Sequence, residues 1–332
     1  MNDITKKTHM TMTSQFNAIH QYLCKLLLLG LFLSVLSCSQ LDRPHTELTI
    51  DSDLDQAVFV TPEDAAKTFM LALLTDDLEL LRKILGANFQ EVLPLEKLTD
   101  ADVIAFIDAW KIANTLLPQG EQKRLIAVGE DKWTLPIPIV AGTSGWYFDI
   151  HEGFERMRIR RIGRNELAAM QTVLAYYDAQ MEYAEQFRDN NDTLAYAQKF
   201  ISPPGTHEGL YWKATPNETL SPLGPMLADC TPGGGYHGYF YKILNAQGES
   251  AQGGAYSYLR GDLMQAGFAL IAWPEEYGAS GVMSFLLSHE GIIYEQDLGE
   301  DSTSIAEKIS TYNPDSGWRA TKEVYTTLSS KP

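Results

Sequence analysis

Residues 267–299, GFALIAWPEEYGASGVMSFLLSHEGIIYEQDLG, decide the fold of the C-terminal half of this chain. Three runs within this stretch are rich in β-branched, aliphatic and aromatic residues, at 267–273, 281–288 and 292–297. Short glycine-bearing segments separate the runs, as tight turns between strands require. A similar run at 236–244 comes first, so the pattern predicts a four-stranded antiparallel meander. A short helix at 304–309 is expected to close it.

The segment before the meander predicts one long helix, from Asn165 to about Phe187. Asn165 is a favourable N-cap residue, and Glu166 adds a negative charge to the first turn. Apolar residues recur every three or four positions along the segment, which predicts one buried face. The acidic turn at 189–192 lacks the Gly and Glu spacing of an EF-hand calcium loop, so no metal site is predicted.

Three helices are expected near the start of the folded part of the chain. Thr61 and Pro62, followed by acidic residues, are typical of a helix start. A second, short helix follows and ends at Gly86, the residue type that most often terminates helices. The third helix is predicted over residues 100–117, which carry apolar residues on one face.

Three strands are expected after these helices, at 123–128, 133–140 and 145–150. Pro136 and Pro138 make the middle strand an edge or irregular strand. The chain is therefore predicted to be α+β, with an N-terminal domain of helices plus a curved antiparallel sheet at 58–162. The long helix and the C-terminal meander form a second domain at 163–332. By analogy of pattern, the first domain is similar to NTF2-like or cystatin-like domains and the second to pilin heads.

The N-terminus has the features of an export signal. Residues 26–36, LLLLGLFLSVL, carry no charge and follow Lys25. They are too short for a membrane-spanning helix, which needs about 20 apolar residues. The sequence Val-Leu-Ser-Cys at 35–38 resembles a lipoprotein cleavage box, which predicts a signal peptide at 1–37 and acylation of Cys38. The alternatives are ordinary cleavage near Ser39 or an uncleaved anchor.

The residues after Cys38 predict a lipid-anchored location. Residues 38–57 are polar and acidic, and we interpret them as a flexible tether between the lipid and the fold. Ser39 occupies the position where Asp signals inner-membrane retention in enteric bacteria. We therefore expect an anchor in the outer membrane of the cell envelope, facing the periplasm.

Composition excludes several classes of protein. Among 332 residues, 26 are Lys or Arg and 43 are Asp or Glu, which gives a formal net charge of -17. A strongly acidic chain is a poor binder of nucleic acid, so no nucleic-acid partner is expected. Three Cys are too few for a disulfide framework or a Cys₄ zinc site, and no cofactor is predicted.

A cluster of arginines is the first candidate site. Five arginines fall within nine residues of this acidic chain: Arg156, Arg158, Arg160, Arg161 and Arg164. The functional interpretation is an anion site or a docking patch for an acidic partner. The structural interpretation is a helix start whose charges neutralise nearby acids, because runs of charge are usually solvated faces.

Aromatic and acidic residues around two predicted strand ends form the second candidate site. The candidate binding residues are His237, Tyr239, Trp273, Glu275, Glu276 and Tyr277. Aromatic rings beside two carboxylates are suited to binding a sugar or a peptide, or to acid–base hydrolysis. The structural interpretation is a strand packed on both faces, with the two carboxylates in a solvated loop.

Three stretches resemble domain-of-unknown-function family 2950, and the resemblance covers essentially the whole exported chain. They are RIGRNEL at 161–167, GLYW at 209–212 with SPLGP at 221–225, and the stretch at 267–299. The resemblance implies an exported, often lipid-anchored envelope protein. It implies no catalytic residues, because the family has no established activity.

Three functions are compatible with these observations. The first is a non-catalytic, lipid-anchored cell-envelope protein that binds a protein partner or a cell-wall component. It is favoured because the chain lacks a zinc-protease, hydrolase-elbow or dinucleotide motif. The second is a periplasmic hydrolase that uses His237, Glu275 and Glu276. The third is a pilin-head-like assembly subunit.

Overall fold

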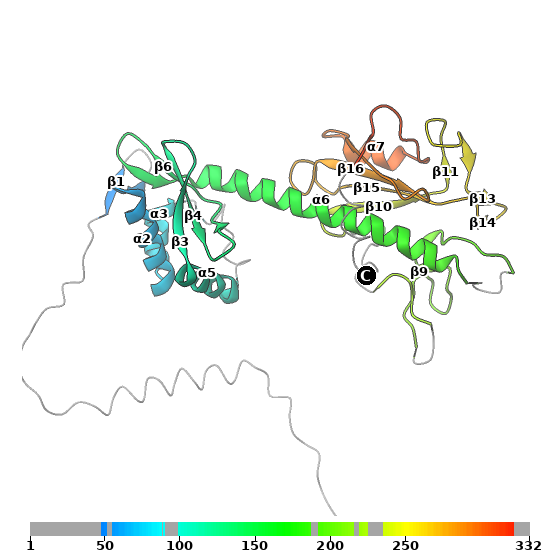
Figure 1. Cartoon of the computed structure of the whole chain (residues 1–332), viewed down its shortest axis with the longest axis horizontal. Coiled ribbons are helices and arrows are strands. Elements are labelled where there is room, and N and C mark those ends of the chain that lie inside the picture. Colours follow the sequence, from blue (N-terminus) through cyan, green and yellow to red (C-terminus); the bar gives the residue numbers. More distant parts are fainter. Residues whose placement is uncertain are drawn as a thin grey trace, which may run out of the picture. The chain divides into compact units, whose positions relative to one another are not determined.

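The computed structural model describes residues 48–51, 55–87, 89, 99–186, 192–215, 219–224 and 235–321. The predicted signal peptide, Cys38 and most of the acidic turn at 189–192 lie outside the described residues. Within the described residues no helix combines the length and the apolar character needed to cross a membrane. The fold is α+β, as predicted, with helices and several antiparallel sheets (Figure 1).

The N-terminal module, residues 48–149, combines an antiparallel sheet with three helices among its described residues, around one hydrophobic core. The helices are α2 (Pro62–Thr75), α3 (Leu78–Leu85) and α5 (Asp100–Ile112). The sheet has the order β3-β4-β6-β7, with β5 paired to β4. Its strands are β3 (Asn114–Pro118), β4 (Lys123–Val128), β5 (Trp133–Thr134), β6 (Ile139–Ala141) and β7 (Trp146–Phe148).

Side-chain caps set the starts of these helices, and the cap at Thr61 is the one that the sequence predicts. The Thr61 hydroxyl accepts a hydrogen bond from the Asp64 amide, and the Asp77 carboxylate accepts one from the Leu80 amide. Thr99 and Asp102 form a complete capping box at the start of α5. Caps act within one turn of the chain, which explains why local sequence finds them.

The predicted end of the third helix is wrong. α5 ends at Ile112, and residues 114–118 form strand β3 instead of the last helical turn. Ala113 adopts an extended conformation, with φ -157° and ψ 141°, so the chain leaves the helix there. β3 then pairs with β4, placing Leu116 opposite Ile126. This tertiary pairing overrides the helical spacing of the apolar residues.

The tether is shorter than predicted, because residues 48–57 include ordered strands. β1 (Thr49–Asp51) pairs with β2 (Gln56–Val58) in an antiparallel arrangement. The Gln56 side chain is buried and donates to the carbonyls of Ile84 at 2.6 Å and Phe148 at 2.8 Å. The polar composition of residues 38–57 gives no sign of this role, because Gln56 stabilises the core through hydrogen bonds and not through apolar contacts.

A single helix, α6 (Ile150–Tyr183), follows the N-terminal sheet without interruption. It begins at Ile150 instead of Asn165, so the predicted domain boundary at 162/163 falls inside it. The Asp149 carboxylate caps it by accepting from the Glu152 amide at 2.9 Å. Ion pairs one turn apart, such as Glu152 with Arg156, support the added turns.

The C-terminal module, residues 192–321, is built on the predicted antiparallel meander. Its sheet has the order β10-β15-β16-β17-β18. The strands are β10 (Tyr239–Leu244), β15 (Ala269–Pro274), β16 (Met283–Ser288), β17 (Ile293–Asp297) and β18 (Arg319–Ala320). All six residues of β15 are buried, so both faces of the sheet are covered. α6 covers one face and α7 (Ser302–Lys308) the other (Figure 1).

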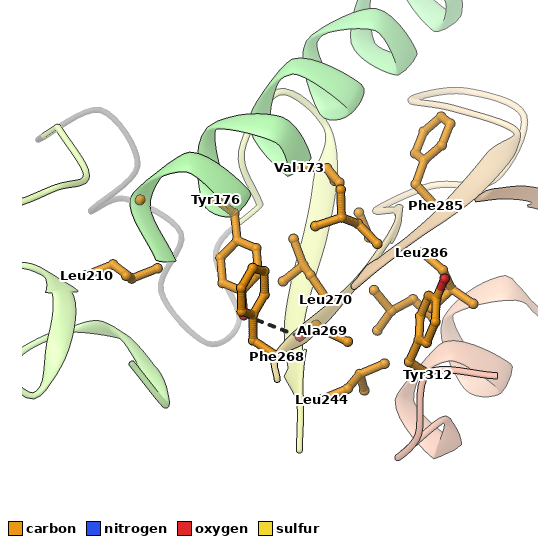
Figure 2. Close-up of a cluster of buried hydrophobic side chains, with 14 of the residues drawn as sticks. Val173, Tyr176, Leu210, Leu244, Phe268, Ala269, Leu270, Phe285, Leu286 and Tyr312 are labelled. Atoms are coloured by element: carbon orange, nitrogen blue, oxygen red, sulfur yellow. Dashed lines mark hydrogen bonds between the residues drawn. The ribbon is translucent and has the colours of Figure 1, made fainter. Parts of the chain in front are cut away.

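The core of this module joins α6 to the sheet. Figure 2 shows Val173 and Tyr176 of α6 beside Leu270 and Phe268. The Tyr176 hydroxyl donates to the Ala269 carbonyl at 3.3 Å and accepts from the buried Gln180 amide at 2.9 Å. Burial raises the pKa of Tyr176 well above its usual range, so the phenol stays neutral.

Several short strands in the C-terminal module were not predicted. β8 (Lys199–Ile201) pairs with β9 (Gly209–Tyr211) in parallel. Two small ladders follow β10: β11 (Ala246–Gln247) with β12 (Tyr256–Ser257), and β13 (Leu259–Arg260) with β14 (Leu263–Met264). Such two- and three-residue strands carry too few residues for an alternating pattern to be visible.

Candidate functional site

Part of the arginine cluster contacts the turn that directly follows the acidic residues of the aromatic–acidic cluster. Arg158, Arg161 and Asn165 lie on one stripe of α6, because three- and four-residue steps share a helix face. Each donates to a successive carbonyl of the turn between β15 and β16: Arg158 to Gly278 at 2.5 Å, Arg161 to Ala279 at 3.1 Å and Asn165 to Ser280 at 2.8 Å. We call this helix-to-turn contact the α6 junction.

Glu166 completes the α6 junction. One oxygen of its carboxylate, Oε1, accepts from the amides of Val282 and Met283, both at 3.0 Å. The sequence interpretation of Asn165 and Glu166 as a helix N-terminus is therefore wrong. Both residues lie in the middle of α6 and bind the turn. Their partners are more than 110 positions away in the chain, with a separation of 115 for Asn165 and Ser280, so no local signal could have shown the contact.

A second turn packs against the α6 junction at Gly238. This residue has φ +76°, and a Cβ placed there would lie 2.8 Å from Asn165 Nδ2 and 2.9 Å from Ser280 Cβ. Glycine is required both by the left-handed backbone and by this close approach. The preceding His237 also has a positive φ, of 53°, and its side chain is exposed at the tip of the turn.

The remaining arginines of the cluster contact the N-terminal module or solvent. Arg156 pairs with Glu152 at 2.8 Å and donates to Gln119 at 2.5 Å. Arg160 donates to the carbonyl and hydroxyl of Thr134, and its guanidinium lies over the Trp133 ring. Arg164 makes no hydrogen bond or ion pair with the described residues. Four of the five arginines therefore have partners within the described residues. Only Arg156 and Arg158 pair with acids, and the cluster lies inside α6, so it is not the helix start that the structural interpretation expected.

Glu152 is the most heavily paired acid beside this cluster. It contacts Lys123 at 2.6 Å and Arg156 at 2.8 Å. Burial alone would raise the pKa of Glu152, but the hydrogen bonds and charges of Lys123 and Arg156 outweigh it and hold the pKa below 4.5. A lowered pKa means that the ionised carboxylate favours the folded state.

Because of this pairing, we expect the free energy of unfolding to fall with pH below the ordinary pKa of a glutamate. The contribution of Glu152 is complete above 4.5, its unfolded value, and is lost as pH falls through its lower folded pKa. The measurement is Tm between about pH 6 and about pH 3 for the wild type and Glu152→Gln. The stability gap between them should narrow as pH falls, and a constant gap would contradict the expectation.

The structure divides the aromatic–acidic cluster into core and surface residues. Tyr239 is fully buried and its hydroxyl donates to the Met283 carbonyl at 2.9 Å. Burial and the nearby Glu166 carboxylate raise the pKa of Tyr239 far above its usual range. Trp273 is also buried and lies against Phe240, with ring centroids 5.8 Å apart. These two aromatic residues therefore belong to the core.

The other candidates of that cluster lie on the surface around the α6 junction. Glu275 and Glu276 are exposed, and the Glu275 carboxylate lies against the backbone of Gly235. The Tyr277 hydroxyl donates to Asp297, and this hydrogen bond is the main cause that raises the pKa of Tyr277. Within the described residues, no hydrogen bond or ion pair joins His237 to either glutamate. An acid–base pair is therefore not assembled by direct contact here.

The fold and the site define an α+β protein in which one long helix is bound to the turns of a C-terminal meander. The chain belongs to the family described as "Protein of unknown function (DUF2950)", whose family model matches residues 56–321. No curated protein and no solved structure matches the chain. The analogies to NTF2-like, cystatin-like and pilin-head folds therefore stay predictions.

The α6 junction gives a physical meaning to the family resemblance. Two of the stretches that carry it, 161–167 and 267–299, contain all of the junction's residues except Arg158 and Gly238. On the helix, Arg161 and Asn165 supply donors and Glu166 supplies the acceptor.

Proposed function

We propose that this protein is a lipid-anchored protein of the cell envelope that acts by binding a protein partner or a cell-wall component, and not by catalysis. The observation that carries the proposal is the division of the aromatic–acidic cluster. Tyr239 and Trp273 pack in the core, while His237, Glu275 and Glu276 lie exposed without mutual hydrogen bonds. Hydrolysis requires a nucleophile or a pair of acid–base groups held in fixed geometry.

The location rests on the N-terminal sequence. A charged start, an eleven-residue uncharged run at 26–36 and a small residue before Cys38 together support export and lipidation. A single acyl chain binds membranes weakly, so stable anchoring needs more than one chain. A strongly acidic chain is repelled by anionic headgroups, so its composition supports attachment to the membrane through the lipid.

Cys38→Ser should abolish lipidation, because it removes the thiol that would be acylated. The measurement is metabolic labelling with an alkyne fatty acid, followed by separation of membrane and soluble fractions. Wild type should carry the label and sediment with membranes, whereas Cys38→Ser should lose both properties. Cys24→Ser is the matched control, because it removes a thiol within the predicted signal and should leave labelling intact. Full labelling of Cys38→Ser would contradict the proposal.

Crosslinking in cells tests the binding role. Reproducible crosslinks to one envelope component in the wild type, and their loss in Cys38→Ser, are the expected result. Turnover of an envelope substrate by the purified chain, abolished by Glu275→Gln or His237→Ala, would contradict the proposal and favour the hydrolase. Self-association of the chain through its C-terminal module would instead favour an assembly subunit.

A further inference from the structure

An open pocket of about 550 Å³ lies on the N-terminal module, away from the α6 junction. Its floor is one cross-strand row of the sheet, formed by Lys123 of β4, Val140 of β6 and Tyr147 of β7. Alternate residues of a strand face opposite sides. Ile139 and Phe148 therefore point into the hydrophobic core, while Val140 and Tyr147 point into the pocket.

The walls of the pocket are polar and come from two separate segments. The β3–β4 turn contributes Gln119, Glu121 and Gln122, and the residue before α6 contributes Asp149. Arg124 Nη1 donates to the carbonyls of Gly120 and Glu121, both at 3.2 Å, which fixes the path of the turn. The Gln122 carbonyl accepts from the Ala141 amide at 2.9 Å, so the turn is tied to the floor.

Hydrogen bonds orient the polar groups before any ligand arrives. Arg156 donates a hydrogen bond to the side-chain oxygen of Gln119, so the NH₂ group of Gln119 is left to donate to a ligand. Lys123 is held by Glu152 at 2.6 Å and keeps further N–H donors. The Tyr147 ring packs against Gly142, where a Cβ would approach within 2.9 Å of the ring. Such preorganisation lowers the entropic cost of binding.

The chemistry of the pocket selects its ligand. The Lys123 charge is offset by Glu152. The exposed Glu121 carboxylate and the half-buried Asp149 carboxylate, which also caps α6, make the walls acidic, and this disfavours phosphate-rich ligands. Planar amide and carboxylate groups around one aromatic ring suit the hydroxyls and the C–H face of a sugar. Val140 and Ala141 add a small apolar surface that suits an acetyl methyl group.

We infer that this pocket binds a neutral glycan that contains N-acetylated amino sugars. The Tyr147 ring stacks on one sugar face. The Gln119 NH₂ and the Lys123 ammonium donate to the acetamide carbonyl, and the Val140–Ala141 surface contacts the acetamide methyl group. The inference rests on the proposed binding function and narrows its ligand to the carbohydrate part of the cell wall. A volume of about 550 Å³ is within the range of small-ligand sites.

The test is calorimetric titration of the chain from residue 48 onward, which forms one compact unit, with N,N′,N″-triacetylchitotriose. Saturable binding with Kd on the order of 1 mM is expected for such an open pocket. Tyr147→Ala should weaken binding by about five- to tenfold because the stacking ring is lost. Trp133→Ala is the matched control, because Trp133 is an exposed aromatic residue of the same module that does not line the pocket.

A second variant guards against misfolding of the first. The exposed Gln122 side chain makes no hydrogen bond within the described residues, so Gln122→Ala should fold normally and still weaken binding. Maltotriose, which lacks acetamido groups, should bind at least tenfold more weakly. Absence of chitotriose binding, equal binding of maltotriose, or binding unaffected by both variants would overturn the inference. If the chain did not bind chitotriose but still crosslinked to an envelope protein in cells, the glycan inference would fail and the broader proposed binding function would stand.

Discussion

Gly281→Ala should lower the free energy of unfolding by about 2–4 kcal/mol, one of the largest effects of any single-methyl change in the chain. A Cβ at Gly281 would lie 2.1 Å from the Tyr239 hydroxyl oxygen. Tyr239 is fully buried, and this hydroxyl donates to the Met283 carbonyl at 2.9 Å. The ring cannot move outward, so the new methyl group costs packing strain and a buried hydrogen bond together.

A double-mutant cycle separates these two costs. Tyr239→Phe removes the hydroxyl and its hydrogen bond, but it keeps the ring carbons Cζ and Cε2, which would lie 2.6 Å and 2.7 Å from the added Cβ. Gly281→Ala should therefore still be destabilising in that background, with a smaller loss because no buried hydrogen bond is broken. Gly163→Ala is the matched control, because Gly163 lies in α6 with no atom within 4 Å of the added Cβ. It should raise stability by about 0.5–1 kcal/mol through helix propensity. Urea unfolding measures all four variants. An equal loss for Gly281→Ala in both backgrounds would show that the methyl group does not break the Tyr239 hydrogen bond, and no loss in either background would refute the collision with the ring.

The elements that sequence predicted correctly depend on neighbouring residues. Thr61, Asp77 and Thr99 cap their helices through amides three positions ahead. The meander was predictable because its runs are apolar and its turns are short and contain glycine. Both signals are complete within about ten residues, so a single sequence contains them.

The elements that sequence missed depend on distant partners. Asn165 is a residue type that favours helix N-caps. It lies in the middle of α6, however, and its side chain donates to the Ser280 carbonyl. Residues 114–118 have helical spacing, yet pairing with β4 makes them a strand. The floor of the pocket on the N-terminal module likewise depends on how β4, β6 and β7 pair, because their register places Lys123 opposite Val140 and Val140 opposite Tyr147. None of these partners is marked in the local sequence.

Glu166→Ala should destabilise the C-terminal module by about 2–3 kcal/mol, because it removes the acceptor of two backbone amides at once. Glu166 Oε1 accepts from Val282 and Met283, both at 3.0 Å in a partly buried setting. Glu166→Gln keeps a carbonyl oxygen at that position and should cost only about 1 kcal/mol. Glu182→Ala, an exposed change on the same helix, should be nearly neutral.

The effect should be localised as well as large. Met283 is held from both sides, with its amide bound by Glu166 and its carbonyl bound by Tyr239. Hydrogen exchange of the Val282 and Met283 amides should therefore accelerate in Glu166→Ala and much less in Glu166→Gln. Because Glu166 and Tyr239 share Met283, the losses in Glu166→Ala and Gly281→Ala should not add in the double variant. Strict additivity would mean that the helix and the buried tyrosine hold the start of β16 independently, and the α6 junction would then not be a single cooperative unit.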